Sequence, residues 1–278
     1  MKWIISFTLC LSILFLTDCS KDNPDIKGED PKPGTGETTP SIAIKTDSIV
    51  YNNKEHKFLV SLSNNPKIVS VDYYIDGELS KTIFESPYTY TVTLKNLNTG
   101  KHTINVIAKL QDGKLLKDEK NISFLVQKGD EYQGGIVIYV QDGMHGIISA
   151  KNDLEGGISG KYKYGYYREE YNSYSENDGF SNTQKFKGKA DSNFAAIACL
   201  NYNGEGYNDW YLPSLKEFEY LKDFEDTLIQ YRLNNIYWTS TLREDDMHAE
   251  VYFFGRVAIS TNDLDIQKLH YVRPFRKF

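Results

Sequence analysis

Three short segments near the C-terminus constrain the fold of this chain more than any other feature. They are Gly206–Ser214 (GYNDWYLPS), Tyr237–Thr241 (YWTST) and Tyr271–Arg276 (YVRPFR). In the first, Ser214 and Glu217 have the spacing of a capping box, in which each side chain accepts from a free backbone amide of the other's residue. Pro213 disfavours helix for Leu212, so we predict that a helix begins at Ser214. The other two segments are β-branched and aromatic and predict strands, with Pro274 indicating a sheet edge or a strand end.

The order of these segments, together with Gly134–Tyr139 (GGIVIY) and His145–Ala150 (HGIISA) upstream, resembles a known family. Residues Gly129–Phe278 are similar to the C-terminal domain of the Legionella collagen-like adhesin, a former domain-of-unknown-function family with a C-type-lectin-like fold. The resemblance implies a small mixed α/β domain on a bacterial surface protein. It also implies glycan or matrix binding, which is a property of some members.

The N-terminus predicts export. Lys2 is followed by the apolar run Trp3–Leu16, which is too short for an ordinary spanning helix and is typical of a secretory signal. Residues 1–19 resemble a lipoprotein signal peptide whose lipobox ends at Cys19, the predicted lipidation site that would attach the chain to a membrane. A plain secretory signal or an uncleaved anchor is the alternative.

The residues after Cys19 predict a location and a spacer. Ser20–Asp22 resembles the acidic tag with which Bacteroidetes-like bacteria send lipoproteins to the outer face of the outer membrane, so we expect the protein to face the cell exterior. Residues 20–40 are nearly all charged, Pro, Gly, Thr or Ser, and cannot bury enough apolar surface to fold. We predict a disordered spacer there.

Cysteine and charge exclude several classes of protein. The cysteines are Cys10 in the signal, Cys19 at its end, and Cys199. Only Cys199 would remain as a thiol, which excludes an intrachain disulfide and a Cys-based zinc site. Residues 128–278 hold 17 Lys and Arg against 23 Asp and Glu, a net charge of −6. Without a basic stripe we expect no nucleic-acid partner.

Residues 41–127 predict an all-β sandwich. Val69, Val71, Tyr73 and Ile75 alternate on one strand face, and the set His102, Ile104, Val106 and Ala108 does so on another. Hairpin or turn signals occur at Asp76-Gly77, Asn98–Gly100 and Asp112-Gly113, and about seven strands fit this spacing. The segments Val71–Gly77, Ser86–Tyr88 and Gly100–Ile104 resemble bacterial Ig-like modules. We interpret this part as a rigid stalk.

Residues 128–278 predict an α+β domain with two helices beside short antiparallel strands. Phe194, Ala195, Ala198, Cys199 and Tyr202 share one face of a helix over 191–202, so Cys199 is expected to be a buried, inert thiol. The second helix is expected over Leu215 to about Gln230.

Four further side chains have two interpretations each. Trp210 and Trp238 are expected in the core, with sugar stacking as the alternative. Arg273 and Arg276 suit a carboxylate clamp, but an ion pair with an acid such as Asp209 or Glu217 is the simpler account.

The segment Lys161–Tyr174 has no helical or strand period and is rich in tyrosine among Gly, Ser, Asn and charged residues. Tyrosine offers a flat apolar face and a hydroxyl, which suits a sugar or protein ligand. The predicted ligand-binding residues are Tyr162, Tyr164, Tyr166, Tyr167, Arg168, Tyr171 and Tyr174. The alternative is that these rings lie down on the domain as a packed cover.

These observations together predict a cell-surface lipoprotein that binds a glycan or a host or matrix glycoprotein without catalysis, as an adhesin does. The alternative is a structural subunit of a surface assembly. An enzyme is less expected, because the sulfatase-activating enzymes that share the fold need cysteines that this chain lacks, and His145, His248 and His270 lie in no nucleophile or metal pattern. We predict no catalytic residue, no cofactor and no metal site.

Overall fold

A computed structural model describes residues 39–278 except 96, 225–234 and 254–263. The predicted signal peptide 1–19, its lipidation site Cys19 and all but the end of the spacer 20–40 lie outside the described residues. The described residues belong to one compact unit, Thr39–Phe278. Among them, no helix has the length and apolar character needed to cross a membrane.

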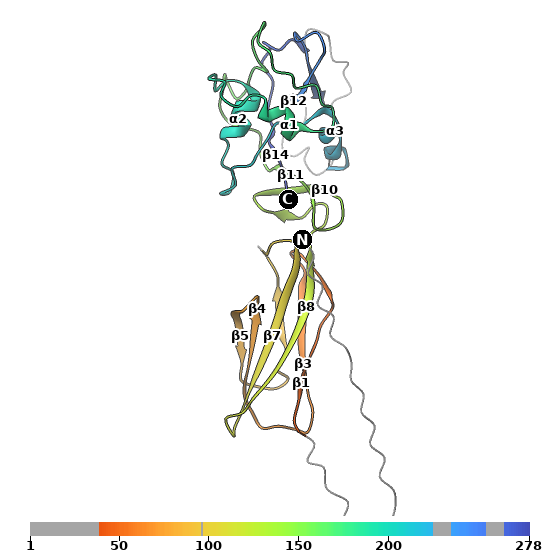
Figure 1. Ribbon diagram of the computed structural model, residues 1–278, viewed down its shortest axis with the longest axis vertical. Coiled ribbons are helices and arrows are strands. Elements are labelled where there is room, and N and C mark those ends of the chain that lie inside the picture. The colour runs from red at the N-terminus through yellow and green to blue at the C-terminus, as the bar shows by residue number, and fades with distance from the viewer. Residues whose placement is uncertain (1–38, 96, 225–234, 254–263) are drawn as a thin grey trace, which may run out of the picture. The chain divides into compact units, whose positions relative to one another are not determined.

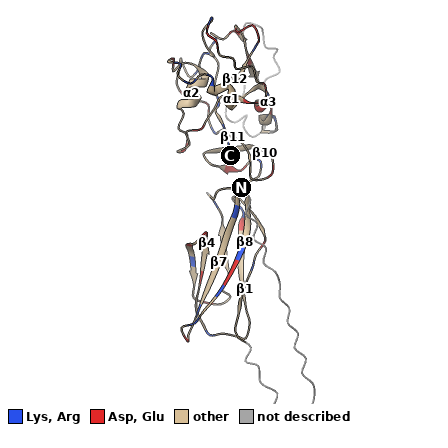
Figure 2. Cartoon of the chain, in the orientation of Figure 1, with Lys and Arg blue, Asp and Glu red and all other residues tan. Residues whose placement is uncertain are grey.

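The first part of the unit is a β-sandwich, as predicted (Figure 1). One sheet contains, in spatial order, β1 (Ile42–Lys45), β3 (Glu55–Leu62) and β6 (Tyr90–Thr93). The other contains β2 (Ile49–Tyr51), β8 (Leu115–Leu125), β7 (Gly100–Leu110), β4 (Ile68–Ile75) and β5 (Glu78–Ile83). All pairs are antiparallel except β2 with β8. Lys117 and Glu119 are exposed on β8, and the ribbon of this strand carries both acidic and basic positions (Figure 2).

The hairpin signals lie where the sequence places them. Asp76 and Gly77 join β4 to β5 with φ of 50° and 85°, the left-handed conformation that a tight hairpin turn requires. Asp112 and Gly113 join β7 to β8. These turns set the strand register, and with it the set of side chains that reaches the core.

The predicted face of β4 is correct except at Val69. Val71 and Tyr73 are fully buried, whereas Val69 is exposed. The reason is a register shift between Ile68 and Ser70 where β4 pairs with β7, which places Ile68 against the core instead. On β7, the buried residues Ile104, Val106 and Ala108 lie on one face as predicted.

The second part is a mixed α/β region. Its main sheet has the order β14 (Phe275–Lys277), β11 (Gly146–Ala150), β10 (Gly135–Val140) and β9 (Glu131–Tyr132), and β12 (Ile236–Leu242) pairs with β13 (Ala249–Phe253). The predicted hairpin across Asp142 and Gly143 is confirmed. The last strand is shorter than predicted: it begins after Pro274, at the edge of its sheet.

The prediction of two helices was wrong. The described residues of this region form three short α-helices, α1 (Gly179–Gln184), α2 (Ala195–Asn201) and α3 (Leu215–Phe218), and the 3₁₀-helix η1 (Glu219–Phe224). The sequence prediction omitted α1, which Asp178 caps by accepting from the Ser181 amide at 3.1 Å. The helix expected from Leu215 to Gln230 becomes 3₁₀ after Phe218, and its residues from 225 onward lie outside the described part.

The predicted capping box forms and also joins two helices. Ser214 accepts from the Glu217 amide, and Glu217 Oε2 accepts from the Ser214 amide at 2.8 Å. The same oxygen accepts from the Gly179 amide at 3.0 Å, and Tyr211 donates to Oε1 at 3.0 Å. Gly179 is required there, because a Cβ would lie 2.5 Å from both Glu217 Oε2 and Ser214 N. Glu217 thus fixes the start of α1 against the start of α3.

The large aromatic side chains form the interior of this region. Trp210 and Trp238 are both buried, which confirms their predicted packing role. Trp238 donates from Nε1 to the Tyr162 carbonyl at 2.8 Å, and its ring packs against Tyr164 with centroids 5.7 Å apart. Cys199 is also fully buried, as predicted, and burial raises the pKa of its thiol well above the ordinary value.

Candidate functional site

The tyrosine-rich segment divides into buried and exposed rings. Tyr162, Tyr164 and Tyr171 are only 5%, 1% and 1% exposed. The ligand contacts predicted for Tyr164 and Tyr171 are therefore corrected, whereas Tyr162 lines a surface cavity together with Asn201. Tyr164 shares a 2.5 Å hydrogen bond with Ser173 and donates to the Ser240 carbonyl at 2.9 Å. Tyr171 stacks on Phe186 with centroids 4.6 Å apart. Burying these large apolar rings is more favourable than leaving them exposed to solvent for contact with a ligand. The three rings therefore anchor the segment to the domain.

The other three rings remain at the surface. Tyr166, Tyr167 and Tyr174 are 38%, 41% and 41% exposed. Each phenol donates to one carboxylate, and the acceptors are Asp191, Asp265 and Asp246 respectively. These hydrogen bonds raise the pKa of all three phenols, because they stabilise the protonated form beside an anion. The three exposed rings are therefore held in fixed orientations, which lowers the entropy cost of contacting a ligand.

Arg168 follows two of these rings in the sequence. It is exposed, with φ at 67°, and in the described part of the chain its guanidinium forms no hydrogen bond or ion pair. It therefore stays on the predicted binding surface with Tyr166, Tyr167 and Tyr174.

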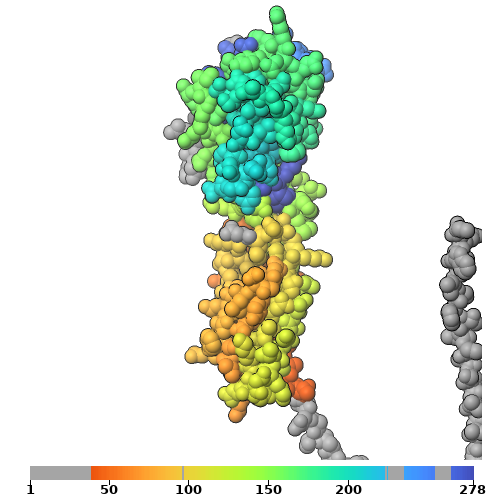
Figure 3. Space-filling view, turned by 60° about the vertical axis from the view of Figure 1, so that its left-hand side comes forward, coloured from red at the N-terminus to blue at the C-terminus, as the bar shows by residue number. Residues whose placement is uncertain are grey.

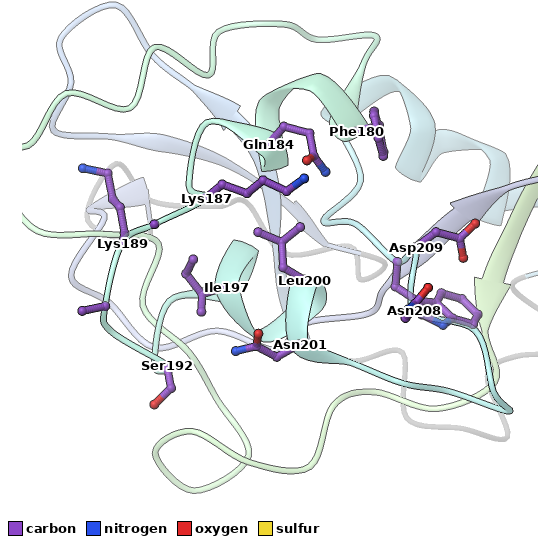
Figure 4. Close-up of a pocket in the computed structure, with 13 residues that line it drawn as sticks. Phe180, Gln184, Lys187, Lys189, Ser192, Ile197, Leu200, Asn201, Asn208 and Asp209 are labelled. Carbon is purple, nitrogen blue, oxygen red and sulfur yellow. The ribbon is translucent and has the colours of Figure 1, made fainter.

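A cavity of about 570 Å³ lies beside this segment, and we call it the α1–α2 pocket (Figure 4). Gln184 lines it from the last residue of α1, Lys187 from the turn that follows, and Leu200 and Asn201 from α2. The lining also includes Ile197, Asn208, Asp209 and Trp210. The surface formed by α1 and α2 is the green-to-teal area of Figure 3. A cavity of this size suits a small ligand or one unit of a longer one.

The chemistry of the α1–α2 pocket is polar around an apolar base. Gln184, Asn201 and Asn208 offer amide donors and acceptors, and the ammonium of Lys187 has no ion-pair partner among the described residues. Ile197 and Leu200 supply apolar surface. Amides near apolar groups can pair with hydroxyls while covering a carbon face, which is the pattern that a sugar presents.

Two contacts join the tyrosine-rich segment to the rim of this pocket. Lys189, which lines the pocket, forms a 2.8 Å ion pair with Glu169. Asp191, the acceptor of the Tyr166 phenol, lies between Ala190 and Ser192, and both of those also line the pocket. The Tyr166 ring packs against Phe194 with centroids 4.9 Å apart. Tyr166 and the α1–α2 pocket therefore belong to one candidate site.

The arginines considered as a carboxylate clamp are both in ion pairs. Arg276 pairs with Asp209 at 2.7 Å, which confirms the simpler account. Arg273 pairs instead with Asp153 at 2.7 Å, a partner that the sequence did not indicate. Glu217, the other suggested acid, is taken up by the capping box.

Residues Gln184, Lys187 and Asn201 were absent from the sequence prediction. Gln184 and Asn201 are ordinary polar residues on short helices and Lys187 lies in the turn after α1, so only the packing of α1 near α2 brings them together. The Asp178 cap was a signal for α1, but no single-sequence signal identifies the pocket. Within the described ranges, no group of three or more His, Cys, Asp or Glu side chains is placed to hold a metal ion.

Comparison with known proteins identifies only the first part of the unit. Residues 40–106 match the family described as Bacterial Ig domain. The β-sandwich is thus Ig-like, and a bacterial Ig domain is typical of surface or secreted proteins. On the basis of its Ig-like domain, the chain is a bacterial surface-type protein. No family is identified for the C-terminal region, and no curated protein matches the chain.

Several solved structures resemble about a third of the chain. Fibronectin(III)-like modules of CbhA from Clostridium thermocellum are 28% identical over 34% of this chain and 50% of theirs, with a TM-score of 0.29. The chain thus spans half the length of those modules. The PKD1 domain of the metalloprotease PrtV from Vibrio cholerae is 12% identical over 31% of this chain and 98% of its own, at 0.23. A β-glucuronidase from Bacteroides uniformis is 20% identical over 32% of this chain and 11% of its own, at 0.24.

Proposed function

We propose that this protein is a non-catalytic, adhesin-like binding protein of the bacterial surface. Its C-terminal region would be a lectin-like domain that binds a glycan or a glycoprotein, and its Ig-like sandwich would be the stalk. The observation that carries the proposal is the α1–α2 pocket, in which Gln184 and Asn201 face a cavity whose rim is joined to the exposed ring of Tyr166.

Three further features support this proposal. The Bacterial Ig domain match indicates a surface or secreted protein. The sequence at Cys19 predicts a lipid anchor, which would place the domain at the outer membrane facing the exterior. The resemblance of Gly129–Phe278 to the C-terminal domain of the Legionella collagen-like adhesin supports a lectin-like fold and a glycan or matrix ligand.

A glycan array probed with residues 39–278 tests the proposal. We expect binding that falls at least tenfold in Tyr166→Ala and in Asn201→Ala. Asn121→Ala is the matched control, because Asn121 is an exposed amide on β8 of the sandwich and should have no effect. Absence of binding to every glycan, or binding that both site variants leave unchanged, would refute the proposal.

A second candidate function rests on the other two exposed rings. Tyr167 and Tyr174 donate to Asp265 and Asp246, and the Ile266 amide next to Asp265 donates to the carbonyl of exposed Met247 at 3.2 Å. Exposed aromatic and Met side chains on adjoining loops suit a protein partner. Cross-linking on intact cells that yields one stoichiometric protein partner, with no glycan bound on the array, would favour a subunit of a surface assembly.

A further inference from the structure

A second cavity, of about 490 Å³, lies on the residues that follow β11 and those that precede β14, and we call it the Arg273 pocket. Its lining includes Asn152, Asp153 and Glu155 from the first segment, and Tyr271 and Arg273 from the second. Ser159 and Asn235, the latter just before β12, add further polar groups to the lining.

Arg273 is buried but not fully hydrogen-bonded. Its side chain is 1% exposed, and both Nε and Nη2 lie 2.7 Å from Asp153 Oδ1. Tyr237 donates to Asp153 Oδ2 at 3.0 Å, so both oxygens of that carboxylate are engaged. Among the residues that the structure describes, Arg273 Nη1 has no hydrogen-bond partner. Native proteins rarely leave such a donor unsatisfied, so an acceptor that occupies the pocket would complete it.

The charges of the lining select the kind of acceptor. Arg273 contributes one positive charge, whereas Asp153 and Glu155 contribute two negative charges. A carboxylate or sulfate ligand would be repelled by this excess, but an uncharged hydroxyl or amide oxygen would not. Such a ligand could also donate to Glu155 and to the amide oxygens of Asn152 and Asn235.

A third cavity, of about 620 Å³, adjoins both pockets. It shares Asn152, Asp153 and Glu155 with the Arg273 pocket, and it shares Ser192 and Asn201 with the α1–α2 pocket. The three cavities therefore succeed one another along the surface from Lys187 to Arg273. A ligand longer than one ring can occupy more than one of them.

From these observations we infer that the Arg273 pocket is a subsite for an uncharged sugar unit of a longer glycan. A hydroxyl or acetamido oxygen of that unit accepts from Arg273 Nη1, and its hydroxyls pair with Asn152, Asn235 and Glu155. The inference rests on the proposed function and names the ligand class as neutral oligosaccharide, with the α1–α2 pocket holding another part of the same chain.

Titration of residues 39–278 with N-acetylglucosamine and, separately, with glucuronate tests the subsite. Nitrogen NMR of the Arg273 guanidinium reports on the unaltered protein. We expect saturable shifts of the Arg273 signal with the neutral sugar and at least tenfold weaker binding of glucuronate.

Variants test the same subsite. Arg273→Lys keeps a positive charge beside Asp153 but lacks the Nη1 donor, and it should weaken binding of the neutral sugar about tenfold or more. Asn152→Ala, at an exposed residue that should not affect folding, is expected to weaken it several-fold, with Asn121→Ala as the matched control.

The outcomes separate this inference from the proposed function. Glycan binding that Asn201→Ala abolishes, but that leaves the Arg273 signal unmoved and is insensitive to Asn152→Ala, removes the subsite and keeps the function. Equal or stronger binding of glucuronate contradicts the charge argument and overturns the neutral-sugar assignment. No binding of either sugar, together with an empty glycan array, overturns both.

Discussion

Arg276 and Asp209 form a two-point ion pair, with Nε 2.7 Å from Oδ1 and Nη2 2.9 Å from Oδ2. Arg276 Nη1 also donates to Gln133 Oε1 at 2.6 Å, and its guanidinium lies 4.0 Å from the centroid of the Tyr207 ring. This arginine on β14 therefore joins the last strand to the turn before β10 and to a wall of the α1–α2 pocket. Paired in this way, it orients the site without being available to a ligand.

The first prediction concerns this pair. Asp209→Ala leaves the buried Arg276 without its carboxylate, so we expect the free energy of unfolding to fall by about 2 kcal/mol. Lys277→Ala, one residue along the strand, is the control: its 3.3 Å pair with Asp178 is exposed and should contribute less than about 0.5 kcal/mol. Urea unfolding measures both variants, and equal effects would contradict the assigned role of Arg276.

The second prediction separates the two kinds of tyrosine. Tyr171→Ala removes a buried ring stacked on Phe186 and should lower the free energy of unfolding by about 3–5 kcal/mol. Tyr174→Ala removes an exposed ring with one hydrogen bond to Asp246 and should cost less than about 1 kcal/mol. Thermal unfolding of both variants is the measurement. Similar losses would mean that the segment is not divided as the structure shows.

Local features of the fold could be predicted from the sequence, and distant ones could not. The capping box of Ser214 and Glu217 is correct because both residues lie within one helical turn. The burial of Tyr164 depends on Ser240, 76 residues away, and the partner of Arg273 is 120 residues away. No period or spacing in the chain encodes such pairs, so the tyrosine-rich segment could be recognised but not divided into buried and exposed rings.

The third prediction concerns pH. His145 is the main reason that the pKa of Asp142 falls from 3.8 to about 2, through a 2.8 Å hydrogen bond, and the Met144 amide adds to it. Because the folded pKa is below the unfolded one, this stabilisation is present above about pH 4 and is lost as the pH falls towards 2.

In His145→Ala, carboxyl NMR should show the Asp142 pKa move back towards 3.8. His248→Ala, in the similar turn after Asp245, should leave it unchanged. An unmoved pKa in His145→Ala would show that the backbone amides alone hold this carboxylate.

The fourth prediction concerns the joint between α1 and α3. Glu217→Ala leaves the Gly179 amide, the Ser214 amide and the Tyr211 hydroxyl without their acceptor in a buried setting. We expect the free energy of unfolding to fall by about 3 kcal/mol or more. Glu219→Ala, which removes a 3.6 Å ion pair with Lys216 near the surface, should change it by less than about 0.5 kcal/mol. Chemical denaturation compares the two, and a mild effect of Glu217→Ala would show that water replaces the carboxylate.

The fifth prediction uses the thiol of Cys199, the sole cysteine of residues 39–278. Because burial both blocks access and raises the thiol pKa, the native protein should react with a disulfide reagent at pH 8 at least about 1,000-fold more slowly than the urea-unfolded chain. The rate then reports how often the α2 face opens, and Tyr171→Ala, which loosens the Phe186 and Phe194 cluster beside α2, should raise it. Immediate reaction in native buffer would show that α2 is not packed on the domain, and the α1–α2 pocket would lose one of its walls.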